Sequence, residues 1–389
     1  MLRAQLDHII GQIMDQAPEA SDIIFTVNKP VQVEVHGVLQ DVKLTPDPGP
    51  LLPFHVESIA MTLMGRTMRL YEDQIERGSC DLSYELPGRF RFRVNIFSQR
   101  GSMAIVLRKL AIRIPDMDEL GLPEIFTEIA KENYGLVLVT GATGTGKTTS
   151  LAALIDMINS QFAKHIITLE DPVEYVHPHK KATINQRELG IDFDTFSSGL
   201  RAALRQAPKV ILVGEIRDQT TTEIALEAAE TGHLVLGTLH TSDAGQSVNR
   251  IIGMFELSEE RLIRARLAES LKYVVSQRLL PKIGGGRVAA FEVLRTSLRI
   301  RELILNGESD EKTFYHVLET STTHKMVTFD QHLRELFLQG LITEQAAMAY
   351  CSERSRLSQM LDKIKAERGE KVTDIDRLEL DYNYGKDAF

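Results

Sequence analysis

Hydrophobic positions in the first hundred residues follow helical spacing at the start and strand spacing afterwards. Leu6, Ile9 and Ile13 recur at helical intervals. Beyond them, short apolar or alternating runs, in two places joined by a turn that contains proline, predict strands at residues 23–27, 31–35, 81–86, 90–97 and 105–107. This pattern predicts a small α+β domain over residues 1–110, followed by a linker rich in proline and glycine over residues 111–123.

The pattern changes from Gly135 onward. Short runs of β-branched and aliphatic residues now alternate with helical stretches, which predicts strands at residues 136–139, 166–169, 210–213 and 234–239. Strands that alternate with helices indicate a parallel sheet covered on both faces. From Ser258 the chain is predicted to be mostly helical, apart from a strand at residues 288–293. We therefore expect an α/β domain with a helical C-terminal part over residues 124–350.

The end of the chain, residues 351–389, is dense in charge and poor in large apolar residues. Such a composition predicts a helix that frays into a mobile tail. The sequence shows no internal repeat that would add a further domain.

Composition narrows the class of protein. The 389 residues carry a net charge of −9, which disfavours a general attraction to nucleic acid. No apolar run approaches the roughly 20 residues that span a bilayer, so contact with a membrane is expected only through partners. The 2 cysteines lie far apart and predict neither a disulfide framework nor a zinc site. Together these features indicate a cytoplasmic two-domain protein.

A glycine-rich turn directly follows the strand predicted at residues 136–139. The pattern G-x-x-x-x-G-K-[ST] is matched by Gly141, Ala142, Thr143, Gly144, Thr145, Gly146, Lys147 and Thr148, and Thr149 continues into a helical stretch. Glycines in such a turn let successive backbone N–H groups point inward at the start of a helix, which forms an anion-binding nest. The lysine reaches the β- and γ-phosphates, and the next hydroxyl binds Mg²⁺. The sequence therefore predicts a P-loop that binds ATP with Mg²⁺.

Acidic residues follow two of the predicted strands. Glu170 directly follows one strand, and Glu215 comes two residues after another. The carboxyl ends of parallel strands share one edge of the sheet with the P-loop. Phosphoryl transfer needs a metal ligand and a group that orients the attacking water. Acids at strand ends are often plain loop residues, but two of them downstream of a P-loop favour catalysis, with Glu215 as the first candidate for activating water.

Histidines flank the strand predicted at residues 234–239. His233 precedes it, and His240 follows it. A histidine at the carboxyl end of a core strand could sense the γ-phosphate, or it could be structural, and both interpretations stay open. His177 and His179 share a loop with prolines, but the pair resembles a metal site only superficially, so we expect no metal there.

Arginines alternate with apolar residues in the predicted strand at residues 90–97. The two-residue period places Arg89, Arg91 and Arg93 on one face, and Arg108 follows nearby. One interpretation is a solvated basic face. The other is that one or two of them act as arginine fingers on the transferring phosphoryl group, at a domain or subunit boundary.

Four segments together carry a family resemblance. Residues 141–148, 167–174, 211–218 and 232–241 resemble, in order and spacing, the Walker A, Asp, Walker B and His boxes of the type II/IV secretion ATPase superfamily. Residues 20–23 and 284–290 extend the likeness outside the core. The resemblance implies a RecA-like P-loop core preceded by a PAS-like domain. Within the superfamily the chain is similar to type IV pilus retraction ATPases of the PilT/PilU group, and residues 353–389 favour the PilU type.

The resemblance also implies a function. It predicts a hexameric motor that couples MgATP hydrolysis to pilus retraction and twitching motility at the cytoplasmic face of the inner membrane, with an inner-membrane platform protein and a PilT-type ATPase as partners. The alternative is an accessory subunit that binds nucleotide and assists a PilT-type motor by assembly. By resemblance the functional residues are Glu215 as general base, Glu170 beside it, Lys147, the sensors His233 and His240, the Mg²⁺ ligands Thr148, Glu170 and Glu215, and the nucleotide-contacting Arg91, Arg93 and Arg108.

Overall fold

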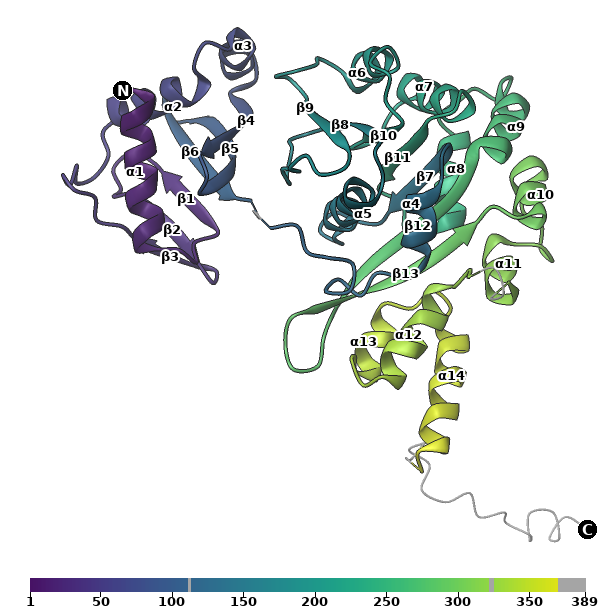
Figure 1. Ribbon diagram of the computed structural model, residues 1–389. Helices are drawn as coiled ribbons and strands as arrows, with labels where there is room; N and C mark the ends of the chain where they lie inside the picture. Colours follow the sequence, from purple (N-terminus) through teal and green to yellow (C-terminus); the bar gives the residue numbers. More distant parts are fainter. Residues whose placement is uncertain (111–112, 322–324, 370–389) are drawn as a thin grey trace, which may run out of the picture.

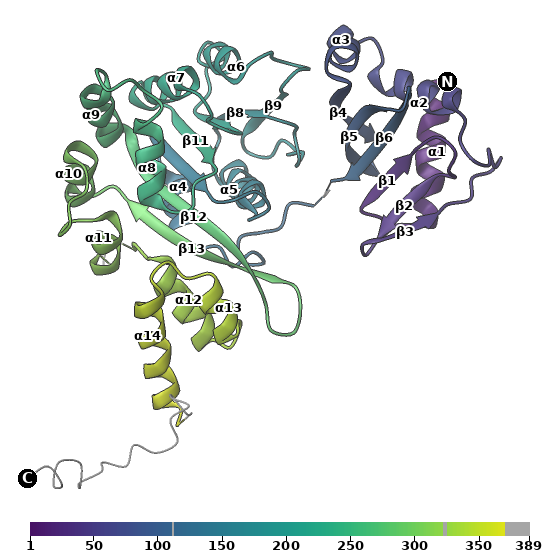
Figure 2. The ribbon, with the colours of Figure 1, turned by 180° about the vertical axis from the view of Figure 1, so that it is seen from behind.

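The structure, a computed structural model, describes residues 1–110, 113–321 and 325–369. An N-terminal α+β domain is joined by an extended segment to an α/β core, and helices at the end of the chain pack below that core (Figures 1 and 2). Within the described residues, no helix combines the length and the apolar composition needed to cross a membrane.

The N-terminal domain is built on one antiparallel sheet with the strand order β3-β2-β1-β6-β5-β4. Its strands are β1 (Asp22–Phe25), β2 (Gln32–Val35), β3 (Val38–Asp41), β4 (Ser79–Leu86), β5 (Phe90–Gln99) and β6 (Ser102–Lys109). Its helices are α1 (Arg3–Gln16), α2 (Pro53–Met64) and α3 (Met68–Arg77). Alternation along β5 buries Phe92, Val94 and Ile96 against the helices, while Arg93 between them stays exposed. The two predicted hairpins are confirmed.

The core sheet has the order β13-β12-β7-β11-β10-β8-β9. Its strands are β7 (Gly135–Thr140), β8 (His165–Glu170), β9 (Thr183–Glu188), β10 (Val210–Val213), β11 (Leu234–Leu239), β12 (Leu271–Pro281) and β13 (Arg287–Arg295). The neighbours from β12 to β9 all pair in parallel, and only β13 runs antiparallel to β12. The predicted α/β class with a parallel sheet is confirmed, and the four strands expected from the sequence lie side by side at its centre.

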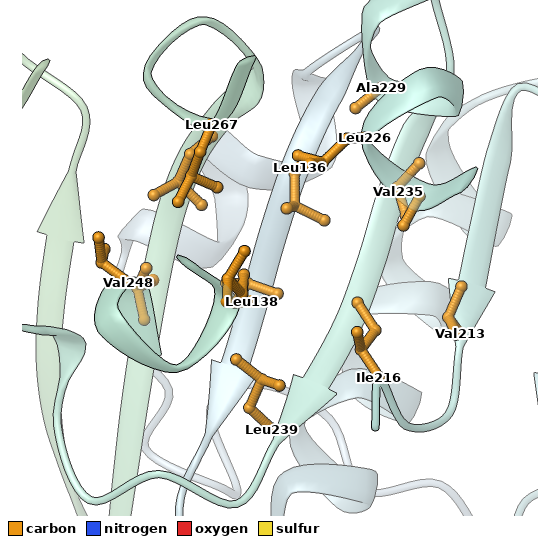
Figure 3. Packing of buried hydrophobic residues seen from close by; sticks show 14 of the residues in the cluster. Leu136, Leu138, Val213, Ile216, Leu226, Ala229, Val235, Leu239, Val248 and Leu267 are labelled. Carbon is orange, nitrogen blue, oxygen red and sulfur yellow. The ribbon is translucent and has the colours of Figure 1, made fainter. Parts of the chain in front are cut away.

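Helices cover both faces of this sheet. They are α4 (Ile125–Lys131), α5 (Lys147–Gln161), α6 (Phe196–Ala203), α7 (Gln219–Glu230), α8 (Ala244–Ile252) and α9 (Glu260–Ser270). On one face, shown in Figure 3, Leu136 and Leu138 of β7 pack with Val235 of β11, Leu226 of α7 and Leu267 of α9. The opposite face packs against α4 and α5. Because both faces are buried, the central strands are continuous apolar runs. The polar side chains that could act in catalysis lie at the ends of these strands.

The expectation of mostly helical structure after Ser258 is wrong for residues 271–281. This segment is the long strand β12, which pairs with β7 and forms a hairpin with β13. Tyr273, Val274 and Val275 are buried consecutively on both faces, so the segment shows no strand alternation. Lys272 and Gln277 also interrupt the apolar run, so the hydrophobic pattern did not predict a strand here.

The C-terminal region is helical. It comprises α10 (Leu298–Asn306), α11 (Phe314–Thr320), α12 (Phe329–Leu338), α13 (Glu344–Ala349) and α14 (Arg354–Glu367). Leu357, Leu361 and Ile364 of α14 are buried against α12 and α13, so packed structure continues beyond residue 350, where we expected the tail to begin. Of the mobile tail predicted over residues 351–389, residues 370–389 lie outside the described residues, as do linker residues 111–112.

Candidate active site

A cavity of about 1020 Å³ lies at the carboxyl ends of the parallel core strands. The predicted phosphate loop lines it with Gly144, Lys147 and Thr148. The end of β8 contributes Glu170, and the loops after β10 and β11 contribute Glu215 and His240. Ligand sites of α/β sheets form at this edge, because the loops that follow parallel strands meet there. The fold thus brings together residues that are far apart in the sequence.

Two glycines fix the shape of the phosphate loop. Gly141 has a φ of +145°, and a Cβ there would lie 2.4 Å from the Gln277 carbonyl oxygen. Gly146 has a φ of +89° and caps the N-terminus of α5. L-residues with side chains rarely adopt these angles. The backbone can therefore turn its N–H groups toward the start of α5, where the helix dipole favours an anion.

Lys147 is only 8% exposed and lies inside the loop. Its Nζ donates to the carbonyl oxygens of Gly141 at 2.6 Å and Ala142 at 3.0 Å. Burial lowers the pKa of Lys147, and the nearby charge of Glu215 opposes that effect. An ammonium group has three donors, so one remains for a phosphate oxygen.

Glu215 connects the loops after β10 and β11. Its carboxylate oxygen is 2.6 Å from Nε of Arg217 and 3.3 Å from Nε2 of His240. The other ring nitrogen of His240 lies 3.4 Å from the Thr143 hydroxyl of the phosphate loop. Burial alone would raise the pKa of Glu215, but Arg217 and His240 outweigh it, and the pKa falls below its usual value. Glu215 is therefore an ionised carboxylate at neutral pH that faces the phosphate loop.

Glu170 is held differently. Its Oε1 accepts hydrogen bonds from Thr168 at 2.6 Å and Gln186 at 3.1 Å. Burial raises the pKa of Glu170, and both hydrogen bonds lower it. Burial has the larger effect, so the pKa rises to about 7. Glu174 also lines the cavity, where burial raises its pKa against a hydrogen bond with Thr148 and the charge of Arg93. The carboxyl groups of Glu170, at the end of β8, and of Glu174, on the loop after it, thus titrate closer to neutrality than that of Glu215.

The predicted Mg²⁺ ligands Thr148, Glu170 and Glu215 all line this cavity. In the described part of the chain, no three His, Cys, Asp or Glu side chains are grouped tightly enough to hold a metal by themselves. Mg²⁺ in phosphate-binding sites takes only one or two carboxylates and completes its shell with water and phosphate oxygens. Hard oxygen donors around a phosphate loop fit such an ion.

His233 does not belong to this site. It precedes β11, and its Nδ1 lies 3.1 Å from the Ala228 carbonyl oxygen at the end of α7. Six residues of strand, about 20 Å, separate it from His240 at the other end of β11. The residues before and after a strand lie at opposite edges of the sheet, so the structure does not bring His233 together with His240, and its role as a sensor stays a prediction.

The predicted arginines lie on the N-terminal domain, outside the residues that line the cavity. Arg91 is 2.9 Å from Glu188 at the end of β9, Arg93 is 3.8 Å from Asp81, and Arg108 is 2.9 Å from Asp22. The Arg91 contact joins the two domains, and Ser83 also donates to Glu188. Within one chain these three arginines therefore pair with carboxylates.

Several cavity residues carried no predicted role. Arg217 holds Glu215, Tyr175 contacts the Thr149 hydroxyl at 3.2 Å, and Gln277 accepts a hydrogen bond from Ser150 at 2.9 Å. Arg217 lies two residues after Glu215, a spacing that could have indicated it. Gln277 had no such signal, because its strand β12 was not predicted.

Fold and site together define a P-loop ATPase core preceded by an α+β domain. The sequence profile of the family described as "Type II/IV secretion system protein" matches residues 5–349. The chain is 42% identical to the type IV pilus retraction ATPase PilT of Pseudomonas aeruginosa over 84% of this chain and 93% of that protein. It is 40% identical to the type IV pilus ATPase PilU of the same organism over 88% of this chain and 87% of that protein.

Solved structures agree with these sequence relatives. A crystal structure of the pilus retraction motor PilT with bound ADP superposes with a TM-score of 0.79 at 42% identity, over 90% of this chain and 98% of that one. The ATPase DotB of Legionella pneumophila reaches a TM-score of 0.77 at 28% identity, over 90% of this chain and 95% of that one. The chain therefore belongs to the type II/IV secretion system protein family, in its PilT/PilU group of ATP-hydrolysing pilus retraction enzymes. Identities of 42% and 40% do not separate the PilT type from the PilU type.

Proposed function

We propose that the chain is a hexameric motor of the PilU-like type that couples MgATP hydrolysis to type IV pilus retraction, the movement that produces twitching. The observation that carries this proposal is the contact of Glu215 with Arg217 and His240, in the same cavity as Lys147. A P-loop without an ionised carboxylate opposite it would bind nucleotide but would lack a group to orient water. Here the P-loop and the Glu215 carboxylate line the same cavity.

In the proposed mechanism, the backbone of residues 141–148 holds the phosphates, and Lys147 turns its free donor to them. Glu215 orients the attacking water and accepts its proton, which its ionised state permits. His240 joins this carboxylate to Thr143, so the position of Glu215 responds to the phosphate loop. Glu170 assists by accepting hydrogen bonds from water beside Glu215.

Mg²⁺ would be held by Thr148 with Glu170 and Glu215, directly or through water, and Glu174 lies beside the Thr148 hydroxyl. When bound, the ion neutralises charge on the phosphate oxygens. Arg91, Arg93 and Arg108 would contact nucleotide only after leaving their present carboxylate partners, in the same subunit or in a neighbouring one.

The proposed setting follows from the relatives. We place the hexamer at the cytoplasmic face of the inner membrane, against a pilus platform protein and together with a PilT-type ATPase, without contact to nucleic acid. The net charge of −9 supports partners other than nucleic acid.

Retraction tests the proposal in cells. A host strain that lacks its own copy of this chain is complemented with wild type, with Glu215→Gln, or with Glu311→Gln, which changes an exposed acid that does not line the cavity. We expect wild type and Glu311→Gln to restore twitching zones and Glu215→Gln to fail at equal protein level. Full twitching with Glu215→Gln would contradict a hydrolysis-driven motor and would favour the accessory subunit.

A further inference from the structure

The N-terminal domain contacts the core at strand β9. β4 and β9 are edge strands of their sheets, and they lie on the facing sides of the two domains (Figures 1 and 2). Arg69 of α3 lies against the backbone of Gly190, just after β9, because a Cβ on Gly190 would come within 2.0 Å of Nη1 of that arginine. Ser83 of β4 and Arg91 of β5 both contact the carboxylate of Glu188, the last residue of β9.

The carboxylate of Glu188 is shared between the two domains. Its side chain is only 7% exposed. Ser83 donates to its Oε1 at 2.8 Å, and Arg91 donates to its Oε2 at 2.9 Å. Oε2 also accepts the backbone N–H of Val173 at 3.2 Å, on the loop that follows β8. Glu188 therefore holds a loop of the core and is itself held by the N-terminal domain.

Val173 directly precedes two residues that contact the first turn of α5. The Glu174 carboxyl group is hydrogen-bonded to Thr148. The Tyr175 hydroxyl lies 3.2 Å from the Thr149 hydroxyl. The first turn of α5 is the part of the helix at which phosphates are expected to bind. Direct contacts thus lead from the N-terminal domain through one side chain of β9 to the phosphate-binding end of α5.

A second side chain of β9 holds the same loop. Gln186 donates to the carbonyl oxygen of Tyr175 at 2.7 Å and accepts the N–H of His177 at 2.8 Å. It also donates to Glu170 at 3.1 Å. These partners all belong to the core, whereas Glu188 also has partners in the N-terminal domain. Glu188 is therefore the side chain through which the position of that domain can act on the loop.

We propose that Glu188 is a positioning residue that couples the N-terminal domain to the nucleotide site. When Ser83 and Arg91 hold its carboxylate, that carboxylate fixes Val173 and the loop after it, and the first turn of α5 binds nucleotide more tightly. The coupling is reciprocal, so bound nucleotide strengthens the domain contact by the same factor. This inference rests on the proposed nucleotide site and adds to it a means by which the position of one domain changes nucleotide affinity.

Ser83→Ala tests the coupling at a position that does not line the cavity. It removes the hydroxyl that donates to Glu188 and keeps both charges of the ion pair with Arg91. The probe is a fluorescent N-methylanthraniloyl derivative of ADP, because ADP lacks the γ-phosphate toward which Arg91 would move in the proposed mechanism. We expect its affinity for the purified full chain to fall by about three- to tenfold. Ser79→Ala, a matched change at the first residue of β4, should bind the probe like wild type.

Hydrogen exchange gives a second readout that needs no nucleotide. The Val173 N–H donates to Glu188, so peptides that contain Val173 report whether the carboxylate still holds the loop. In the protein without nucleotide, we expect faster exchange in Ser83→Ala than in wild type or in Ser79→Ala. Unchanged exchange of these peptides in Ser83→Ala would overturn the proposal.

A double-mutant cycle decides whether Ser83 acts through Glu188. We expect Glu188→Ala to lower probe affinity at least as much as Ser83→Ala does, and the two changes together to lower it no further. Glu188→Gln keeps an oxygen for the Val173 N–H, so it should retain more affinity than Glu188→Ala. The melting temperature of each variant identifies any that fails to fold, and Glu188→Gln takes the place of Glu188→Ala in the cycle if the latter does.

Two results would overturn the coupling. One is an unchanged probe affinity in Ser83→Ala, because a contact that only holds the domains together would alter stability and not nucleotide binding. The other is a loss from Ser83→Ala that is equally large with and without Glu188. Wild-type protein that does not bind the ADP derivative would instead contradict the proposed function itself.

Discussion

Glu292 of β13 is a buried carboxyl group whose ionisation should weaken the folded state. It is 3% exposed, and its Oε1 accepts the N–H of Ala244 at 2.9 Å, at the first residue of α8. Burial raises the pKa of Glu292 from 4.5 to about 7. The Ala244 hydrogen bond and the charge of Arg278 act against this rise, whereas Asp243 adds to it.

The sign and size of the effect follow from linkage. A carboxyl group with a raised pKa binds its proton more tightly in the folded state, so its contribution is fully present below pH 4.5 and is lost as pH rises toward about 7. Each pKa unit is worth about 1.4 kcal/mol, so ionised Glu292 makes folding less favourable by roughly 3 kcal/mol. Glu292→Gln keeps an oxygen for the Ala244 N–H and removes the charge. It should stabilise the protein by about 3 kcal/mol at pH 8 and by about 1 kcal/mol or less at pH 5.

Thermal unfolding of wild type and Glu292→Gln from pH 5 to pH 8 measures this difference. Glu170 and Glu174 have raised pKa values as well, so the loss of wild-type stability with rising pH has several sources, and only the difference between the two proteins reports Glu292. Glu311→Gln, an exposed control, should follow wild type throughout. A gain that is independent of pH, or larger at pH 5 than at pH 8, would refute the reasoning.

Two further predictions concern the nucleotide site. Gly141→Ala forces an L-residue to a φ of +145° with its Cβ 2.4 Å from the Gln277 carbonyl oxygen. We expect nucleotide affinity to fall by about tenfold or more, by fluorescence titration, and unchanged affinity would mean that the loop does not form this nest. His240→Asn should lower ATP turnover by at least about tenfold, while His233→Asn should stay within about twofold of wild type. Equal losses would contradict their placement at opposite ends of β11.

The sequence predicted the central strands of the core sheet well, because short apolar runs and glycine-rich turns are local patterns. Four strands of the core follow from short β-branched runs, and the phosphate loop follows from glycines that one turn requires. The strand β12 was missed because Lys272 and Gln277 break its apolar run, although pairing with β7 buries it. Tertiary contact, which no local pattern records, decided its structure.

The sequence predicted the site residues that follow the ends of core strands. It did not predict the residues whose side chains reach the site from other elements. Glu215 and His240 face the cavity because each follows a parallel strand. The sequence motif grouped His233 with His240, but it did not show that the two residues lie at opposite edges of the sheet. Glu188 carried no predicted role, because its contacts with both domains became visible only in three dimensions.

The most direct test of the central claim is the steady-state ATPase activity of the purified protein, with its oligomeric mass recorded in the same buffer with and without MgATP. Lys147→Ala and Glu215→Gln are measured beside wild type and Glu311→Gln. We expect a hexamer that hydrolyses ATP, no turnover in Lys147→Ala, and nucleotide binding with turnover reduced by about 100-fold or more in Glu215→Gln. Turnover of Glu215→Gln close to that of wild type would contradict the site described here, and a wild-type hexamer that binds ATP without turnover would contradict the motor.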